Sequence, residues 1–84
     1  MENGEINMAI GFVLITTAPT HEHDVYTKLS KVPEIIELHP LFGECDLIAK
    51  IEADDFENLG VVVVNKIRSI DGVIDTKTLT GTKF

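Results

Sequence analysis

The chain has 84 residues, 14 acidic and 7 basic side chains and a net charge of −7, which predicts one small, acidic, soluble domain over residues 1–84 with a polar lead at 1–7. A chain of this length buries only about 60–65% of its unfolded surface, so we expect copies of it to associate. The negative charge repels phosphate backbones and the basic residues are scattered, which argues against direct binding of nucleic acid.

The single cysteine, Cys45, excludes an intrachain disulfide and a cysteine-based structural metal site, and it is typical of a reducing compartment. We therefore expect a cytoplasmic protein. Residues 1–7 lack the basic and apolar regions of a secretory signal, and no apolar run approaches the roughly 18 residues of a membrane span. No glycine-rich phosphate loop is present, and we expect no cofactor and no membrane partner.

The first part of the chain predicts a strand, a helix and a second strand. Residues 8–16 are continuously apolar and rich in β-branched side chains, which favours a strand. A helix follows, with Thr20 as its N-cap, acidic side chains in its first turn and Pro33 preventing its continuation. Residues 34–39 are the next predicted strand, and Pro40 indicates that this strand lies at a sheet edge or at a bulge.

A third strand and a second helix follow a turn at residues 43–46. Residues 47–52 alternate apolar and polar side chains, as a half-buried strand does. Asp54 is the predicted N-cap of a helix that runs to about Ile70. Its apolar residues fall on one stripe, which is predicted to face the sheet: Phe56, Leu59, Gly60, Val63, Ile67 and Ile70. Within this stripe, the glycine is expected to mark a close contact between helix and sheet.

Residues 73–80 form the predicted last strand, after a break at Asp71-Gly72. The order β-α-β-β-α-β predicts an α+β fold, the ferredoxin-like plait, in which both helices cover one face of a four-stranded antiparallel sheet.

The first strand is apolar on both sides, although a central strand of a monomeric plait should alternate apolar and polar side chains. One side carries Met8, Ile10, Phe12 and Leu14, and the other carries Ala9, Gly11, Val13 and Ile15. Burying the second set would contribute several kcal/mol, comparable to the whole stability of a small domain. We therefore expect two sheets to stack face to face. The alternative is that the small residues Ala9 and Gly11 tolerate water.

Other polar residues give weak signals for chemistry. The His-Glu-His-Asp run at 21–24 has the residue types of a metal site, but two histidines two positions apart on a helix do not face each other, so we interpret it as a solvated first turn. His39 is interpreted as a surface or interface histidine, because no residue near it in sequence orients it as a base. Cys45 has acidic neighbours that disfavour a thiolate nucleophile. We predict no catalytic and no metal-binding residue.

The Gly-Glu-Cys-Asp turn at 43–46 has a more specific interpretation. A glycine-bearing turn can present several main-chain N–H groups, and Asp46 adds a carboxylate beside them. Donors next to an anion suit the carboxylate and the ammonium group of a free amino acid, although most turns of this composition are only turns.

With these features, the chain resembles the effector-binding domain, or RAM domain, of the leucine-responsive/asparagine regulator family (Lrp/AsnC). The resemblance extends from about Ala9 to Leu79. It is carried by an apolar strand ending in Ile15-Thr16-Thr17, by the segments 29–35 (LSKVPEI) and 42–47 (FGECDL), and by 66–73 (KIRSIDGV) leading to 76–79 (TKTL). The Gly-Glu-x-Asp turn and the Ile-x-Gly-Val junction are its more specific parts.

The resemblance implies a dimer whose sheets face each other, assembly of dimers into rings such as octamers, and a pocket between neighbouring dimers for an amino acid or similar small effector. It also implies that the Asp46 carboxylate binds the ammonium group of the ligand and that the turn amides bind the carboxylate of the ligand. The residues that the resemblance assigns to ligand binding are Phe42, Gly43, Glu44, Cys45 and Asp46, together with Thr76 and Thr78 from the last strand of a neighbour.

The sequence departs from the family pattern in two respects. The usual N-terminal helix-turn-helix is missing, so the chain resembles a stand-alone effector domain that co-assembles with full-length relatives to modulate transcription. Phe42 also stands where the family often has a threonine or serine before the glycine.

We thus expect a non-enzymatic module for amino-acid sensing and oligomerisation. Two alternatives remain. One is a small dimeric plait enzyme, such as a cofactorless monooxygenase or an isomerase, with His39 or Asp46 as its base. The other is a purely structural oligomer.

Overall fold

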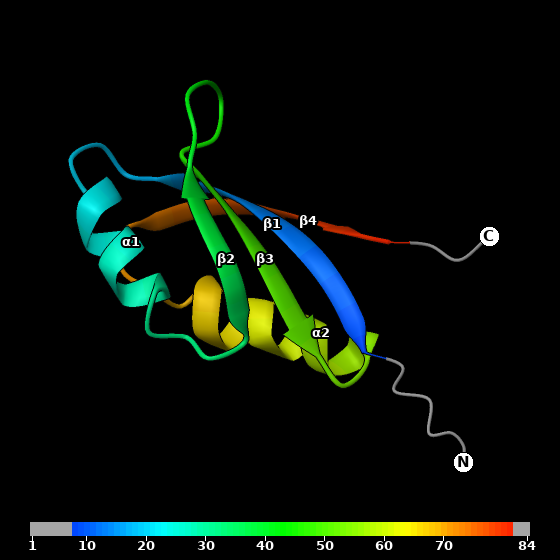
Figure 1. Cartoon of the computed structure of the whole chain (residues 1–84). Coiled ribbons are helices and arrows are strands. Elements are labelled where there is room, and N and C mark those ends of the chain that lie inside the picture. The colour runs from blue at the N-terminus through cyan, green and yellow to red at the C-terminus, as the bar shows by residue number, and fades with distance from the viewer. Residues whose placement is uncertain (1–7, 82–84) are drawn as a thin grey trace, which may run out of the picture.

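The computed structural model describes residues 8–81 as an antiparallel sheet with its helices on one face (Figure 1). Its elements, in chain order, are β1 (Ala9–Thr17), α1 (Glu22–Leu29), β2 (Ile35–Pro40), β3 (Leu47–Ala53), α2 (Phe56–Val62), the π-helical turn η1 (Val63–Ile67) and β4 (Val73–Thr80). The strand order is β2-β3-β1-β4, so that β1 and β3 are central. This arrangement confirms the predicted ferredoxin-like plait and the edge position of Pro40. The predicted polar lead, residues 1–7, lies outside the described residues.

The first helix begins one residue later than predicted. Thr20 is not its N-cap, because this residue has a φ of 69°, in the left-handed region, whereas an N-cap residue is typically extended. His21 occupies the N-cap position, and no side chain caps the helix there. The helix ends at Leu29, before the predicted stop at Pro33.

The second helix is capped by Asp55 rather than by the predicted Asp54. The Asn58 amide donates a 2.7 Å hydrogen bond to the Asp55 carboxylate. The helix widens into η1, where the Arg68 amide donates to the Val63 carbonyl, an i→i+5 bond of 2.8 Å. The regular helix therefore ends well before the predicted Ile70.

The close contact between helix and sheet lies at Gly11, and the prediction that Gly60 marks it is wrong. Gly60 is exposed on the outer side of α2, and a Cβ atom added there would meet nothing within 4 Å. A Cβ added at Gly11 would lie 3.0 Å from Leu59 Cδ2. Phe56, also predicted to face the sheet, is 57% exposed.

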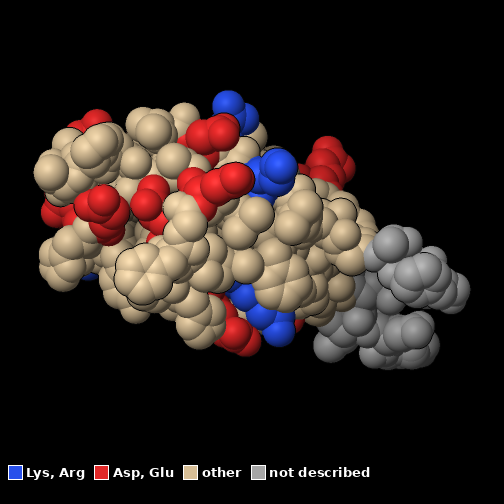
Figure 2. All heavy atoms as spheres, turned by 90° about the horizontal axis from the view of Figure 1, so that it is seen from above, with Lys and Arg blue, Asp and Glu red and all other residues tan. Residues whose placement is uncertain are grey.

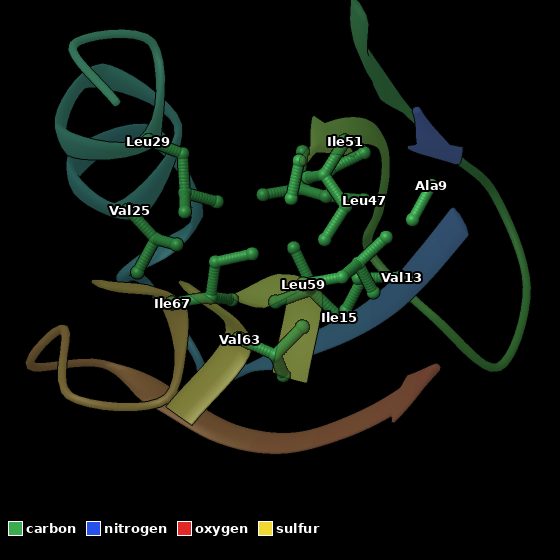
Figure 3. Packing of buried hydrophobic residues seen from close by; sticks show 12 residues of the cluster. Ala9, Val13, Ile15, Val25, Leu29, Leu47, Ile51, Leu59, Val63 and Ile67 are labelled. Carbon is green, nitrogen blue, oxygen red and sulfur yellow. The ribbon is translucent and has the colours of Figure 1, made fainter. Parts of the chain in front are cut away.

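The core lies between the helices and one face of the central strands (Figure 3). The alternate residues of β1 and β3 that face the helices are buried, and α1, α2 and η1 contribute the side chains that meet them, including Val25, Leu29, Leu59, Val63 and Ile67. Ala9 is only 2% exposed and belongs to this face, so the alternative that Ala9 and Gly11 face water is wrong.

The opposite face of the sheet, which we call the open face, has no helix over it within residues 8–81. Its apolar side chains are Ile10, Phe12 and Leu14 of β1, Ile48 of β3 and Leu79 of β4. Phe12 is 40% exposed and lies in register between Lys50 and Leu79, and Lys50 Nζ is 6.0 Å from the centre of its ring. The open face is thus an apolar stripe with charged side chains beside it.

One ion pair links η1 to the start of β2 and makes stability depend on pH. Lys66 Nζ lies 2.8 Å from Glu34 Oε2 and 3.0 Å from Oε1, and this hydrogen bonding lowers the pKa of Glu34 from its ordinary 4.5. Because the folded pKa is depressed, the pair stabilises the protein above the unfolded pKa, and this contribution is lost as pH falls through the folded pKa.

Replacing Lys66 by methionine is therefore expected to lower the free energy of unfolding by up to about 1 kcal/mol at neutral pH and by much less once Glu34 is protonated. Urea unfolding at pH values of about 7 and about 2.5 measures both differences. Lys31→Met is the matched control, since Lys31 forms no ion pair among the described residues. An equal loss at both pH values would contradict the role of the ion pair.

Candidate functional site

The candidate site is built around the loop of residues 41–46, which joins β2 to β3 and projects from one end of the sheet (Figure 1). The Leu41 amide donates to the Asp46 carbonyl at 2.8 Å, which closes the base of the loop. Gly43 has a φ of 122°, a backbone conformation that other residues rarely adopt. The sequence therefore selects one sharp turn at this position.

Asp46 fixes the loop to the end of β1. Its Oδ2 accepts a 2.7 Å hydrogen bond from the Thr17 amide and a 3.1 Å bond from the Thr17 hydroxyl, and the Asp46 amide donates to the Ile15 carbonyl at 2.9 Å. Thr17 is buried, so removing its acceptor would leave a polar group unpaired. We call this set of contacts the Asp46 latch. One carboxylate oxygen thus has a structural role.

The amides of residues 42 to 45 form no hydrogen bond with any other described residue. Phe42, Gly43 and Glu44 are exposed, and Cys45 is half-buried. The loop therefore holds main-chain donors beside a fixed carboxylate, and these groups are chemically able to pair with a carboxylate and with an ammonium group.

An open groove of about 620 Å³ lies between this loop and the first turns of α1. Its residues come from α1, from β2 and the loop, and from the start of β3: Glu22, His23, Tyr26, Pro40, Leu41, Phe42, Gly43, Asp46 and Leu47. The volume is within the range of about 300–1,000 Å³ that is usual for sites of small molecules.

The predicted site residues are only partly brought together within one chain. Phe42, Gly43 and Asp46 line the groove, whereas Glu44 and Cys45 belong to the same loop but do not line it. The sheet register puts Leu47, Ile15 and Thr76 in one row across three strands, so Thr76 lies about 10 Å from the start of β3. Thr76 and Thr78 do not reach the groove of their own chain, and their role across an interface stays a prediction.

A second, smaller cleft of about 310 Å³ contains Thr76 and lies between the end of η1 and the start of β4. It is formed by Arg68 and residues 73–76. The Thr76 amide donates a 3.0 Å hydrogen bond to the Asp75 carboxylate. This cleft has few apolar walls, and the groove at 41–46 is the better candidate for an organic ligand.

Other predicted polar residues lie away from the groove or have local partners. His39 is exposed, and its Nε2 lies 3.2 Å from Glu37 Oε1. His21 Nδ1 lies 3.0 Å from the Pro19 carbonyl. Within residues 8–81 no three His, Cys, Asp or Glu side chains are placed to hold a metal ion, and no helix is long and apolar enough to cross a membrane.

The model of one protein family, the Lrp/AsnC ligand binding domain, matches residues 10–82. The chain belongs to this family. An uncharacterised HTH-type transcriptional regulator of Pyrococcus abyssi is 35% identical over 71 residues, which are 81% of this chain and 47% of the regulator. The chain thus spans about half the length of the curated relatives that it matches.

Several solved structures have the same fold. FFRP-DM1 is 34% identical with a TM-score of 0.84, over 88% of this chain and 99% of that one. A transcriptional regulator of Neisseria meningitidis, solved as a complex with L-methionine, is 19% identical with a TM-score of 0.81, over 98% of this chain and 54% of that one. The latter likeness shows the fold alone.

Sequence reasoning missed the contribution of α1 to the groove of this Lrp/AsnC domain. The sequence pattern at Glu22 and His23 predicts a solvated first turn rather than a metal site, and Tyr26 lies outside the buried helix face formed by Val25 and Leu29. An exposed tyrosine on an otherwise polar helix surface was the available signal, but its proximity to the 41–46 loop depends on the tertiary fold.

Proposed function

We propose that this chain is a regulatory effector-binding module that recognises a free amino acid in the groove at 41–46 and self-associates through its open face. The main support for ligand binding is the Asp46 latch, which holds a loop whose amides are unpaired within residues 8–81 next to a carboxylate. In a family defined by ligand binding, this arrangement supports recognition of a zwitterion. The L-methionine complex of a protein with the same fold is consistent with this ligand class.

Association through the open face follows from its composition. Phe12 and Leu79 are 40% and 50% exposed and adjacent in register, with Ile10, Leu14 and Ile48 beside them. A second sheet packed on this stripe would remove these side chains from water, as in other sheet-on-sheet packings. Assembly of such dimers into a ring such as an octamer would bring Thr76 and Thr78 of one dimer toward the loop of another. Co-assembly with full-length relatives of the same family would connect this module to transcription, in the cytoplasm.

The enzyme alternative has less support. His39 lies on the exposed β2 edge and does not line the groove, and one oxygen of Asp46 is already engaged by two hydrogen bonds from Thr17. Neither residue is positioned as a general base over an enclosed cavity, as a cofactorless enzyme would require.

Calorimetric titration of the protein with each of the twenty amino acids tests the proposal. We expect at least one to bind, and Asp46→Ala to weaken its binding at least about tenfold, because the loop loses its anchor and the ligand ammonium loses its anion. The same substitution is expected to reduce the free energy of unfolding by about 1–3 kcal/mol through the Thr17 contacts.

Asp54→Ala is the matched control, because Asp54 is an exposed acid just beyond the other end of β3. This variant should bind the ligand like the wild type. If no amino acid binds to the wild type, or if Asp54→Ala weakens binding as much as Asp46→Ala, the proposed ligand site is wrong.

A further inference from the structure

The most exposed apolar side chain of the described residues lies at the groove. Phe42 has an exposed fraction of 106%, so its ring packs against no other residue of the described range 8–81, although it lines the groove together with Tyr26, Leu41 and Leu47. Large apolar side chains exposed beside a concave surface are typical of binding sites. The exposed Phe42 ring therefore indicates a binding partner whose contact surface is apolar where it meets the loop at 41–46.

The charges of the groove narrow the class of ligand. Apart from Tyr26, its ionisable residues are Glu22, His23 and Asp46, and none of the lysines or arginines within residues 8–81 lines it. Acidic side chains also gather at the end of the molecule where α1 lies (Figure 2). A ligand with a second negative charge would be repelled there, whereas a single carboxylate can accept hydrogen bonds from the main-chain amides of the loop.

A positively charged ligand side chain would be attracted by Glu22, but Glu22 is exposed, and exposed ion pairs contribute little. Apolar contact with Phe42 and Tyr26 is the larger source of selectivity, since it scales with the area removed from water.

We infer that Phe42 is the specificity-determining residue of this site and selects amino acids with an apolar side chain, which its ring covers when the ligand is bound. The inference rests on the proposed function, because it assigns a ligand class to the same groove. A hydroxyl residue at position 42 would instead offer a hydrogen bond and favour polar ligands.

Isothermal titration with leucine, methionine and phenylalanine, compared with glutamine, lysine and glutamate, tests the inference on the wild type and on three variants. For the wild type we expect at least one apolar amino acid to bind about tenfold or more tighter than any polar one. Phe42→Ser should weaken that binding about tenfold or more and change the binding of glutamine by less than about threefold. Phe42→Leu should retain the preference.

Phe56→Ser is the control, because Phe56 is a second exposed aromatic residue, at 57%, and lies on α2 outside the groove. The affinities of Phe56→Ser for all six amino acids should equal those of the wild type.

If polar amino acids bind as tightly as apolar ones, or if Phe42→Ser leaves the preference unchanged, the inference is wrong while the proposed function stands. If no amino acid binds to the wild type, the proposed function is wrong and the inference with it. A change of molar mass on Phe42→Ser, measured by light scattering, would show that the ring packs against another copy and would likewise overturn the inference.

Discussion

Replacing Phe12 by aspartate is expected to abolish the proposed face-to-face association of two sheets. Phe12 lies at the centre of the open face, between Lys50 and Leu79, and is 40% exposed in the single chain. In a two-fold interface each substitution occurs twice, so the change removes two aromatic side chains and places two carboxylates in an apolar contact. Each lost phenylalanine contributes about 1.5–3 kcal/mol, so the dissociation constant should rise at least about a hundredfold.

Sedimentation or light scattering over a range of protein concentrations measures this change. Phe56→Asp serves as the control, because it introduces the same charge at an exposed aromatic residue on α2, away from the open face. Circular dichroism should show that both variants keep the fold. A wild type that is already monomeric when concentrated, or a Phe12→Asp variant that associates normally, would show that the open face is not the interface.

Replacing Gly72 by alanine is expected to be the most destabilising glycine-to-alanine change within residues 8–81. Gly72 has a φ of 101°, which non-glycine residues rarely adopt, and an added Cβ would lie 2.8 Å from Val25 Cγ2 and 3.1 Å from His21 Cβ. Val25 is fully buried, so α1 would have to move away from the sheet. Backbone strain and overpacking together should cost about 2–4 kcal/mol and lower the melting temperature by more than about 10 °C.

Gly60→Ala is the matched control for this measurement, and its change in the free energy of unfolding should have the opposite sign. Gly60 lies within α2 with nothing within 4 Å of an added Cβ, so alanine should stabilise the helix by about 0.5–1 kcal/mol. Thermal unfolding of the two variants and of the wild type measures both changes in stability. If Gly72→Ala melts at the wild-type temperature, the left-handed backbone and the close contact with α1 are not present in solution.

The strands could be predicted because each carries a local pattern that tertiary structure did not override. The apolar first strand, the alternating third strand and the threonine-rich fourth strand lie within a residue of their predicted bounds. Their order then limited the topology to one plait. The two-sided first strand predicted that a second sheet stacks on the face away from the helices. Within residues 8–81 that face carries apolar side chains and no helix, and the stacking itself stays a prediction.

The helix termini and the groove were less predictable, because they depend on neighbouring backbone. Thr20 has the side chain of an N-cap, but the turn after β1 gives it a left-handed φ. Gly60 suggested a close contact, yet it is Leu59 that faces the sheet, and Gly11 that makes room for it. The composition of the 41–46 loop is enough to predict it as a ligand-binding turn. That Asp46 accepts hydrogen bonds from Thr17, and that Tyr26 lines the groove, can be seen only in the folded chain.

The Asp46 latch joins the loop at 41–46 to the strand that carries part of the open face. Thr17, which holds the loop, ends the same strand that carries Phe12, so β1 connects the groove to the stripe on the open face, with a shift in its pairing to β4 between Thr16 and Thr17. If occupancy of the groove shifts the end of β1, it changes the affinity of one sheet for another. Linkage then requires that assembly change ligand affinity by the same factor, so that protein concentration itself would tune the threshold at which the effector is detected.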